Sequence, residues 1–398
     1  MIKLENISFD HCIKCTICTV YCPVARVTNM YPGPKHSGPD AERLRIKNPG
    51  LIDPSVKYCN NCKRCEIACP SDVNIATIIR NADSKISIKK IRIRDYIMSR
   101  TDFVGNLATK VSTIINALNS SLPVKVFLDL FLKISIKKTL PEYAYGTFRQ
   151  WYKHQSKYQT SYKENVVFFH GCYVNFNDHE LGKDAIKLLN SINIGVFITK
   201  EKCCGVPMIA NGYIKRARKN AKHNIKTLTE ATKNKKSKIV VTSSTCAFAL
   251  KQEYPELLGV KNDTIADRIE YITTYIYRKF RKCDTPPMKP LNITAAYHPP
   301  CHLERLGSAV YTKELLKIIP GLNLKVLHSE CCGISGTYGF KKEYYPISQK
   351  IGENLFRQID SINPDIVITD CETCKWQIEM NTSFEVVHPV TLLARSIL

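Results

Sequence analysis

Short apolar runs alternate with helical patterns along the second half of the chain. Apolar strands are expected at VVFF (166–169) and IVV (239–241), and again at AAY (295–297) and IVI (366–368). Between the strands, segments such as AIKLLNSINI (185–194) place apolar residues at helical spacing. This alternation predicts two similar α/β lobes that face each other, over residues 161–285 and 286–398.

Cysteines recur with these strands, which makes the two lobes an internal repeat. EKCCGVP (201–207) returns as SECCGIS (329–335), and further cysteines follow the apolar runs named above. Three pairs are separated by the same 128 positions: Cys203 and Cys331, Cys204 and Cys332, and Cys246 and Cys374. The repeat places the cysteines of both lobes at strand ends.

The first 80 residues are predicted to be helical. YPGPKHSGPD (31–40) is rich in proline and glycine and is expected to be a loop, after which Asp40 is placed to cap a helix beginning AERLRI. In DVNIATIIRNA (72–82), Ile75, Ile78 and Ile79 have helical spacing. The whole chain is therefore predicted to be an α+β multidomain protein, with a helical domain over 1–80 ahead of the two lobes.

Residues 81–160 connect the helical domain to the lobes and carry 14 Lys and Arg against 5 Asp and Glu. Helically spaced apolar positions run from Phe103 to Leu118 and are followed by VKVFLDLFLKISIKK and the aromatic-rich YAYGTFRQWYKH. Such a segment is typical of helices that lie on a membrane, with Lys137, Lys138 and Arg149 facing anionic lipid. The alternative is that its apolar face packs between the domains. No stretch approaches about 18 consecutive apolar residues, so no membrane-spanning helix is expected.

Eight cysteines in the helical domain form two copies of one motif. CIKCTICTVYCP (12–23) and CNNCKRCEIACP (59–70) share the spacing CxxCxxCxxxCP. This spacing is typical of bacterial ferredoxins, in which three cysteines hold one [4Fe–4S] cluster and the fourth completes the other. Zinc is the alternative for CxxC pairs. The spacing predicts two cysteine sets: Cys12, Cys15, Cys18 and Cys69 for the first cluster, and Cys59, Cys62, Cys65 and Cys22 for the second.

The start of the chain, MIKLENISFDHC, has no basic region, apolar region or small-residue cleavage site of a signal peptide. A reducing compartment is therefore expected. There, cysteine clusters bind metal or carry out redox chemistry more often than they form disulfides.

The two lobes differ in their cysteine sets. The second has Cys301, Cys331, Cys332, Cys371 and Cys374, whereas the first has Cys172, Cys203, Cys204 and Cys246. In the first lobe Ser243 stands where the second has Cys371, and a serine hydroxyl is a poor ligand for iron–sulfur units. If both lobes derive from a cluster-binding unit, the first has therefore lost a ligand. The alternative for adjacent cysteines is that they are buried structural thiols.

Eight stretches between His11 and Pro389 form a recognisable set: CIKCTICTVYCPVARV, YPGPKHSGPDAERLR, YCNNCKRCEIACPSDV, GTFRQWY, KEKCCGVPMIANG, SSTCAFAL, CCGISGTYGFKKE and TDCETCKWQIEM. In this set the chain resembles the family of C subunits of anaerobic glycerol-3-phosphate dehydrogenase. The separate halves are similar to heterodisulfide reductase subunits and to iron–sulfur subunits of glycolate and lactate oxidoreductases. In these relatives the repeated element is the cysteine-rich CCG domain.

The resemblance implies a subunit that takes electrons from flavin-containing catalytic subunits, which oxidise sn-glycerol 3-phosphate to dihydroxyacetone phosphate. It passes them to membrane quinone in anaerobic respiration, and it is a peripheral protein and anchor on the cytoplasmic face of the bacterial inner membrane. The resemblance also implies a non-cubane [4Fe–4S] cluster on the five cysteines of the second lobe. The first lobe departs from that pattern at Ser243.

Several functions are not expected. No glycine-rich dinucleotide fingerprint follows a strand, so the flavin is expected on another subunit and this chain is not expected to be an enzyme on its own. The net charge is +23, but no aromatic-interleaved basic module indicates nucleic acid. Four histidines beside cysteines are expected to donate hydrogen bonds rather than to ligate iron: His11, His170, His298 and His302. The rival hypotheses are a self-contained reductase that acts on thiols at the Cys301 lobe, and an interaction module with purely structural clusters.

Overall fold

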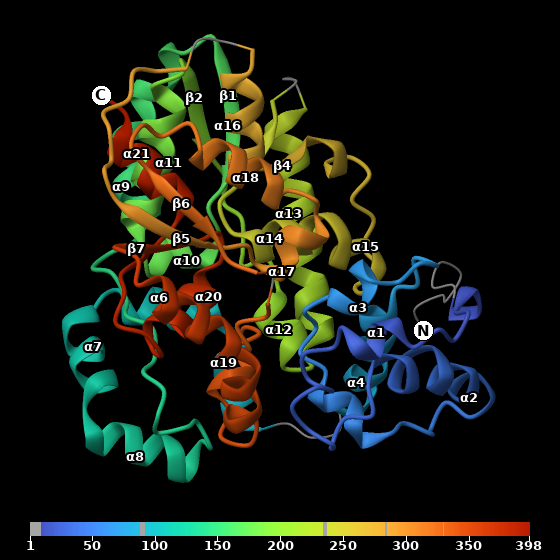
Figure 1. Ribbon diagram of the computed structural model, residues 1–398. Helices are drawn as coiled ribbons and strands as arrows, with labels where there is room; N and C mark the ends of the chain where they lie inside the picture. Colours follow the sequence, from blue (N-terminus) through green and yellow to red (C-terminus); the bar gives the residue numbers. More distant parts are fainter. Residues whose placement is uncertain (1–8, 88–91, 234–236, 283–284, 329) are drawn as a thin grey trace.

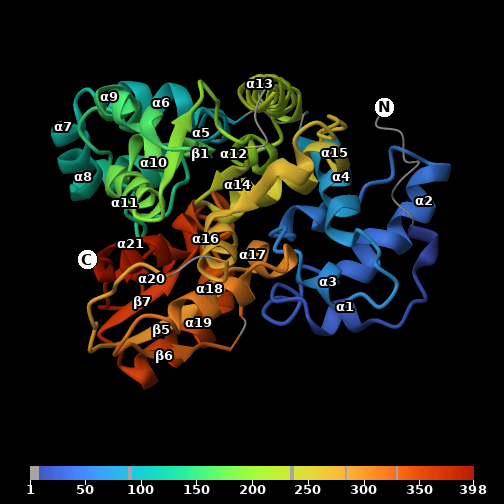
Figure 2. The same cartoon turned by 90° about the horizontal axis from the view of Figure 1, so that it is seen from above.

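The computed structural model describes residues 9–87, 92–233, 237–282, 285–328 and 330–398. The N-terminal domain is helical and lies at the right edge of the molecule in Figure 1 and Figure 2. Its helices are α1 (Ile17–Val20), α2 (Ala41–Lys47), α3 (Arg64–Ile67) and α4 (Ile75–Ser87). The helical spacing of Ile75, Ile78 and Ile79 is confirmed, since α4 buries all three against Val56.

Helix α2 begins at Ala41 as predicted, but the predicted cap is wrong. Residues His36–Asp40 form a π-turn that leads directly into the helix, so Asp40 already has helical φ and ψ of −67° and −46°. A capping side chain needs extended backbone instead. The Asp40 carboxylate therefore pairs with Lys35 at 2.8 Å and with Arg43 at 3.3 Å. Helix α4 also continues past residue 80, so the predicted end of the domain falls inside a helix.

The first lobe contains a parallel sheet in the order β2-β1-β3-β4. Its strands are β1 (Glu164–Phe169), β2 (Ile194–Ile198), β3 (Ile239–Val241) and β4 (Ile269–Tyr271). In register, Val166 lies beside Val196, and Val167 beside Ile239. The helices of this lobe are α10 (Gly171–Phe176), α11 (His179–Asn190), α12 (Val206–Ala210), α13 (Ile214–Thr232), α14 (Ser244–Phe248), α15 (Tyr254–Glu256) and α16 (Ile272–Phe280).

The second lobe repeats this topology in a parallel sheet of order β6-β5-β7-β8. Its strands are β5 (Thr294–His298), β6 (Asn323–Val326), β7 (Ile366–Thr369) and β8 (Val386–Val387). Its helices are α17 (Cys301–Arg305), α18 (Ala309–Leu316), α19 (Tyr345–Ile362), α20 (Glu372–Glu379) and α21 (Pro389–Ser396). The predicted pair of α/β lobes is confirmed, and in both lobes cysteines follow the carboxyl ends of the central strands.

The two lobes are packed against each other rather than joined by a loose linker. Helix α11 lies against α21, and α16 lies against α18, so each lobe contributes two helices to the contact. A single hydrophobic core runs through both lobes, from Phe168 on β1 to Ile368 on β7. Where α16 meets α18, the buried Thr273 and Thr312 hydroxyls are 2.7 Å apart. The lobes therefore hold their cysteine-bearing loops in fixed relative positions.

The connecting segment forms α5 (Ile93–Met98), α6 (Thr101–Ala108), α7 (Ser112–Ser120) and α8 (Leu122–Phe131), and later α9 (Phe148–Gln155). In both views α7 and α8 lie at the left edge, across the molecule from the N-terminal domain (Figures 1 and 2). Their apolar side chains are largely exposed, Ile114 at 62%, Leu122 at 66% and Phe131 at 71%. The helices therefore do not bury their apolar face between the domains.

Among the described residues, no single helix is both long and apolar enough to cross a membrane. Helices α7 and α8 reach the length and composition of such a span only when taken together, and they are bent by 76° relative to each other.

Two of the three basic residues expected to face lipid contact other parts of the protein. After α8 the chain returns over the second lobe, where Ile134 pairs with Lys341 in an antiparallel bridge. This path buries Lys138, whose Nζ donates to Gln377 Oε1, while Lys137 remains exposed. Arg149 extends from α9 towards the first lobe and pairs with Glu201 at 3.5 Å. The expectation that Lys138 contacts lipid is therefore wrong, while Arg149 is only half-buried and its contact with lipid stays a prediction.

Candidate iron–sulfur sites

The two ferredoxin-type motifs fold alike. Lys14 and Asn61, at equivalent positions, have φ of 60° and 56°, and the next equivalent pair, Thr16 and Lys63, have φ of 64° and 66°. These left-handed residues turn each loop before the short helix α1 or α3 begins. Each loop can thus bring three cysteines close together within seven residues.

The structure brings the predicted first cysteine set together. Burial raises the pKa of Cys18, and the neighbouring charges of Cys12, Cys15 and Cys69 raise it further. Of these four, Cys15 is exposed at the surface. The backbone N–H of Val73 donates to Cys69 Sγ at 3.4 Å, a type of hydrogen bond that tunes cluster potentials.

The predicted second set also lies together, and deeper in the molecule. Burial raises the pKa of Cys22 to about 12, with Cys59 as a neighbouring charge. Burial likewise raises the pKa of Cys65, with Glu66, Cys59 and Cys22 adding to the shift. A thiol in such surroundings resists ionisation on its own, whereas bound iron favours the thiolate. The donor sets therefore fit two [4Fe–4S] clusters, and the assignment of each cysteine stays a prediction.

No group of three or more His, Cys, Asp or Glu side chains surrounds a single metal position in the part of the chain that the structure describes. Each cysteine of a cubane ligates a different iron atom, so cluster ligands need not converge on one point.

The second ferredoxin motif lies directly against the second lobe. Hydrogen bonds from the thiols of Cys301 and Cys62 hold the pKa of Cys331 well below its ordinary value. Asn60 Nδ2 donates to Cys331 Sγ at 3.5 Å, and His302 Nε2 lies 3.1 Å from the carbonyl oxygen of Asn61. The ferredoxin cysteines and the lobe cysteines are therefore in contact through Cys62 and Cys331.

The five cysteines of the second lobe converge from three loops. Cys332 and Cys374 have their sulfurs 3.2 Å apart, and a hydrogen bond from Cys374 lowers the pKa of Cys371 well below its ordinary value. Gly333 follows the cysteine pair with φ of +86°, and a Cβ there would lie 2.1 Å from the carbonyl oxygen of Ser348. Only glycine allows helix α19 to approach the loop so closely.

The four cysteines of the first lobe also gather, without a fifth. Hydrogen bonds from Cys172 and Cys204 lower the pKa of Cys203, and Cys204 in turn contacts Cys246. The side-chain oxygen of Ser243 does not act as a fifth ligand beside these four cysteines, because it is already hydrogen-bonded. Its Oγ accepts from the backbone N–H of Cys246 at 3.2 Å, capping α14, and donates to Glu372 Oε1 of the second lobe at 3.0 Å.

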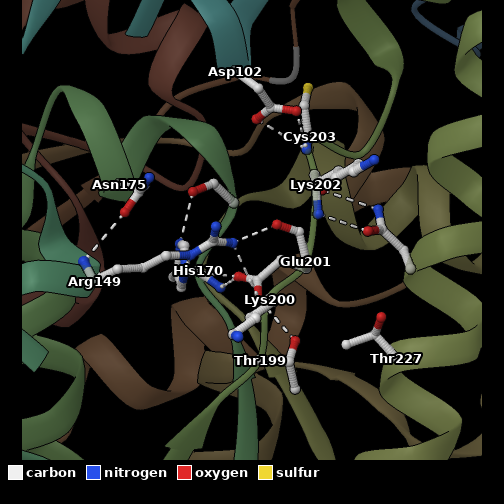
Figure 3. A network of polar contacts seen from close by, with 12 residues as sticks. Asp102, Arg149, His170, Asn175, Thr199, Lys200, Glu201, Lys202, Cys203 and Thr227 are labelled. Atoms are coloured by element: carbon white, nitrogen blue, oxygen red, sulfur yellow. Dashed lines mark hydrogen bonds and ion pairs between the residues drawn. The ribbon is translucent and has the colours of Figure 1, made fainter. Parts of the chain in front are cut away.

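A buried polar network supports the first lobe (Figure 3). His170 Nε2 lies 2.8 Å from Glu201 Oε1, and Arg149 Nε lies 3.1 Å from the same ring nitrogen. Burial tends to raise the pKa of Glu201, but His170 and Arg149 outweigh it and hold the pKa below its ordinary value. The Asp102 carboxylate, from α6, accepts from the Cys203 backbone N–H at 3.0 and 3.2 Å, and burial raises the pKa of Asp102 to about 6.

The four histidines named from the sequence have different surroundings. His170 belongs to the network above, His302 stacks on Phe248 with ring centroids 4.7 Å apart, and His11 is exposed. His298 is buried, and neither of its ring nitrogens has a hydrogen-bond partner among the described residues. Burial lowers the pKa of His298 to about 4. The charge of the neighbouring Cys331 acts in the opposite direction but does not offset this shift. A neutral ring in this position is suited to donate one hydrogen bond to a group held by Cys331.

A cavity of about 730 Å³ is lined by residues of both lobes and of the N-terminal domain. Cysteines of both lobes and of the second ferredoxin motif line it: Cys172, Cys204 and Cys246; Cys301, Cys331, Cys332, Cys371 and Cys374; and Cys59 and Cys62. Glu372 also lines it, and burial raises the pKa of this carboxyl to about 8.

Sequence reasoning does not predict that Asn60, Asp102 and Lys138 lie beside cysteines of the two lobes. Asp102 opens a helix and Lys138 lies in a basic run, both of which are ordinary surface patterns. Each reaches its cysteine only through tertiary packing, across 101 positions for Asp102 and Cys203.

Comparison with known proteins separates the halves of the chain as the structure does. The profile of the 4Fe-4S dicluster domain matches residues 8–73, and that of the cysteine-rich CCG domain matches residues 166–251 and 295–379. The C subunit of anaerobic glycerol-3-phosphate dehydrogenase from Escherichia coli K12 is 53% identical over 99% of this chain and 100% of its own length. The chain belongs to this family of C subunits. The family resemblance and the fold class are thereby confirmed, and the N-terminal domain is one that carries two [4Fe–4S] clusters.

Other similarities are weaker in sequence identity. The D subunit of dihydromethanophenazine:CoB–CoM heterodisulfide reductase from Methanosarcina barkeri is 28% identical over 54% of this chain and 53% of its own length. A hypothetical protein from Helicobacter pylori, known as a crystal structure, aligns with a TM-score of 0.46 and 10% identity over 98% of this chain and 74% of its own. Family membership therefore rests on the C subunits.

Proposed function

We propose that this chain is the electron-transfer subunit of a quinone-linked anaerobic glycerol-3-phosphate dehydrogenase. It takes electrons from flavin-containing subunits that oxidise sn-glycerol 3-phosphate to dihydroxyacetone phosphate, and it delivers them to membrane quinone. The observation that carries this proposal is the contact between Cys62 and Cys331. It joins the ferredoxin motifs to the second lobe, and such a junction has no use in a protein whose clusters are only structural.

The cysteine sets form a series across the molecule. The first set reaches the surface at Cys15. The second set is largely buried, and its Cys62 meets the second lobe. When bound, iron–sulfur clusters supply one-electron transfer. The chain itself holds the sets in this order. Oxidation of the substrate releases two electrons and two protons, and quinone takes up two of each to form quinol.

We place the entry of electrons at the first cysteine set. The loop around Cys15 exposes apolar side chains, with Ile13 and Val20 each 67% exposed and Tyr21 at 52%. An exposed apolar patch around a redox centre suits a protein partner, here the flavin-containing subunits. Val20→Asp is expected to weaken assembly with these subunits, measured by co-purification, while the iron content of the chain stays unchanged. Full assembly of this variant would contradict the entry site.

Membrane attachment is assigned to the opposite end. Helices α6–α8 expose large apolar side chains, and exposed lysines flank them at Lys110, Lys133 and Lys137. This combination suits a peripheral protein on an anionic lipid surface at the cytoplasmic face of a bacterial inner membrane. The N-terminal domain, which contains the entry loop, and α7–α8 lie on opposite sides of the molecule in Figures 1 and 2, as expected of a protein that bridges its partner subunits and a membrane.

The second lobe is the proposed exit of the series. Its five cysteines would hold a further, non-cubane [4Fe–4S] cluster, because they supply a complete set of soft ligands. The first lobe has four, and the oxygen of Ser243 is already committed to the α14 cap and to Glu372. We therefore assign the first lobe a degenerate site with cysteines Cys172, Cys203, Cys204 and Cys246, held in place by the packing between the lobes.

The test compares cysteine variants of the two lobes in the assembled complex. Cys374→Ala is expected to abolish quinone reduction by glycerol 3-phosphate while both ferredoxin-type clusters remain reducible by dithionite. Cys204→Ala is the matched control in the first lobe and is expected to cost less activity. If Cys374→Ala keeps wild-type quinone reduction, the second lobe is not the exit.

A further inference from the structure

A buried lysine lies beneath the cysteine loops of the second lobe. Lys138 belongs to the connecting segment, yet it is only 2% exposed. Its Nζ donates to Gln377 Oε1, and the rings of Phe340 and Tyr345 lie 5.9 and 5.7 Å away. Gln377 is on α20, one helical turn after Cys374.

The charge of Lys138 has no carboxylate partner within the described residues. Its contacts are one amide oxygen and two aromatic faces, which compensate a buried ammonium only in part. Among the described residues, Cys332 is the ionisable neighbour whose thiolate would favour the charged ammonium. Burying an unpaired cation is costly, so the position is expected to receive negative charge from another source.

We propose that Lys138 is the counter-cation of an anionic iron–sulfur cluster held by the second lobe, and that it raises the reduction potential of that cluster. The inference rests on the proposed function in one respect, namely that the second lobe holds a cluster. A cluster bound by thiolates is anionic and becomes more so on reduction. A fixed cation nearby therefore stabilises the reduced form.

The first lobe has the opposite arrangement. There the same connecting segment contributes Asp102, whose carboxylate accepts both hydrogen bonds from the Cys203 backbone N–H. A carboxylate in this position opposes any further negative charge on the adjacent cysteines, because like charges repel in a buried setting. The connecting segment thus biases electrons towards the second lobe, independently of the missing cysteine at Ser243.

The test is an EPR-monitored redox titration of the anaerobically purified full-length chain. The second-lobe signal is identified as the one that Cys374→Ala removes. In Lys138→Met, which keeps a side chain of similar length without charge, its reduction equilibrium is expected to change about tenfold towards the oxidised form, a shift of about 59 mV to lower potential for one electron. Lys138→Arg, which keeps the charge, and Lys137→Gln, an exposed neighbour, are the matched controls and are expected to stay near the wild-type potential.

A second variant covers the case in which Lys138→Met does not fold. Gln377→Glu places a carboxylate against Nζ and neutralises its field, so a shift in the same direction is expected. A Cys374-dependent signal that neither variant shifts would overturn the role of Lys138 and leave the proposed function intact. A wild-type chain without any Cys374-dependent signal would instead overturn the cluster assignment of the proposed function, and this inference with it.

Discussion

Replacing two phenylalanines on α8 is expected to release the chain from lipid. Phe127 and Phe131 pack together, with ring centroids 4.8 Å apart, and remain 53% and 71% exposed. The double variant carries Phe127→Ser and Phe131→Ser. Because the pair contributes little to the protein core, the fold is expected to survive it.

The size of the effect follows from the exposed fractions. Fully burying a phenylalanine side chain contributes about 1.5–3 kcal/mol, so transferring the exposed parts of this pair into acyl chains contributes about 2–4 kcal/mol. The double variant should therefore bind vesicles roughly 30-fold to several-hundred-fold more weakly. This loss should persist at high salt, whereas the loss caused by Lys137→Gln should be evident mainly at low salt, since salt screens surface charge.

The assay is co-sedimentation of the full-length chain with vesicles of phosphatidylglycerol and phosphatidylethanolamine. Val310→Ser is the matched control, because Val310 is 50% exposed but lies on α18 of the second lobe. Circular dichroism and iron content should be unchanged in both variants. If the double variant sediments with vesicles as the wild type does, α8 is not the membrane contact.

Three further outcomes are expected. Cys15→Ser should remove about four of the roughly eight irons of the N-terminal domain, measured by iron assay of anaerobic protein; stoichiometric zinc without iron in the wild type would contradict the cluster assignment. Ser243→Ala removes both the α14 cap and the hydrogen bond to Glu372, so the free energy of unfolding should fall by about 1–3 kcal/mol, and an unchanged Tm would refute this role. Burial lowers the pKa of His388 from 6.5 to about 4. Between these pH values the unfolded chain binds a proton that the native chain does not, so the free energy of unfolding should fall by on the order of 3 kcal/mol as pH drops through this window. His388→Asn should flatten that part of the denaturation profile, and equally steep profiles would contradict the assignment.

Much of the fold could be predicted because strands, cysteine motifs and the repeat each leave a signal within a short stretch of sequence or at a fixed spacing. The 128-residue spacing of Cys203 and Cys331 indicated two like lobes, and apolar runs ending in cysteine placed the sites at strand ends. The turn-rich cysteine motifs, closed by Pro23 and Pro70, likewise predicted the two N-terminal sets.

The remaining features depend on which surfaces meet, and periodicity does not encode that. Lys138 lies in a run of basic residues that looks solvent-exposed, and its burial follows only from the bridge between Ile134 and Lys341. The apolar stripe from Phe103 to Leu118 predicted one face, but the chain breaks it into α6 and α7. The contact of Cys62 with Cys331 likewise joins residues far apart in the sequence.

Rapid freeze-quench EPR of the assembled complex tests the central claim most directly, namely that the second ferredoxin motif delivers electrons to the second lobe. The complex is mixed with sn-glycerol 3-phosphate in the absence of quinone, and wild type is compared with Cys65→Ser, which lacks one ligand of the second cysteine set but leaves Cys62 and Cys331 in place. We expect the Cys374-dependent signal to change in the wild type and to remain unchanged in Cys65→Ser. If that signal changes at the wild-type rate in Cys65→Ser, electrons reach the second lobe by another route and the account is wrong.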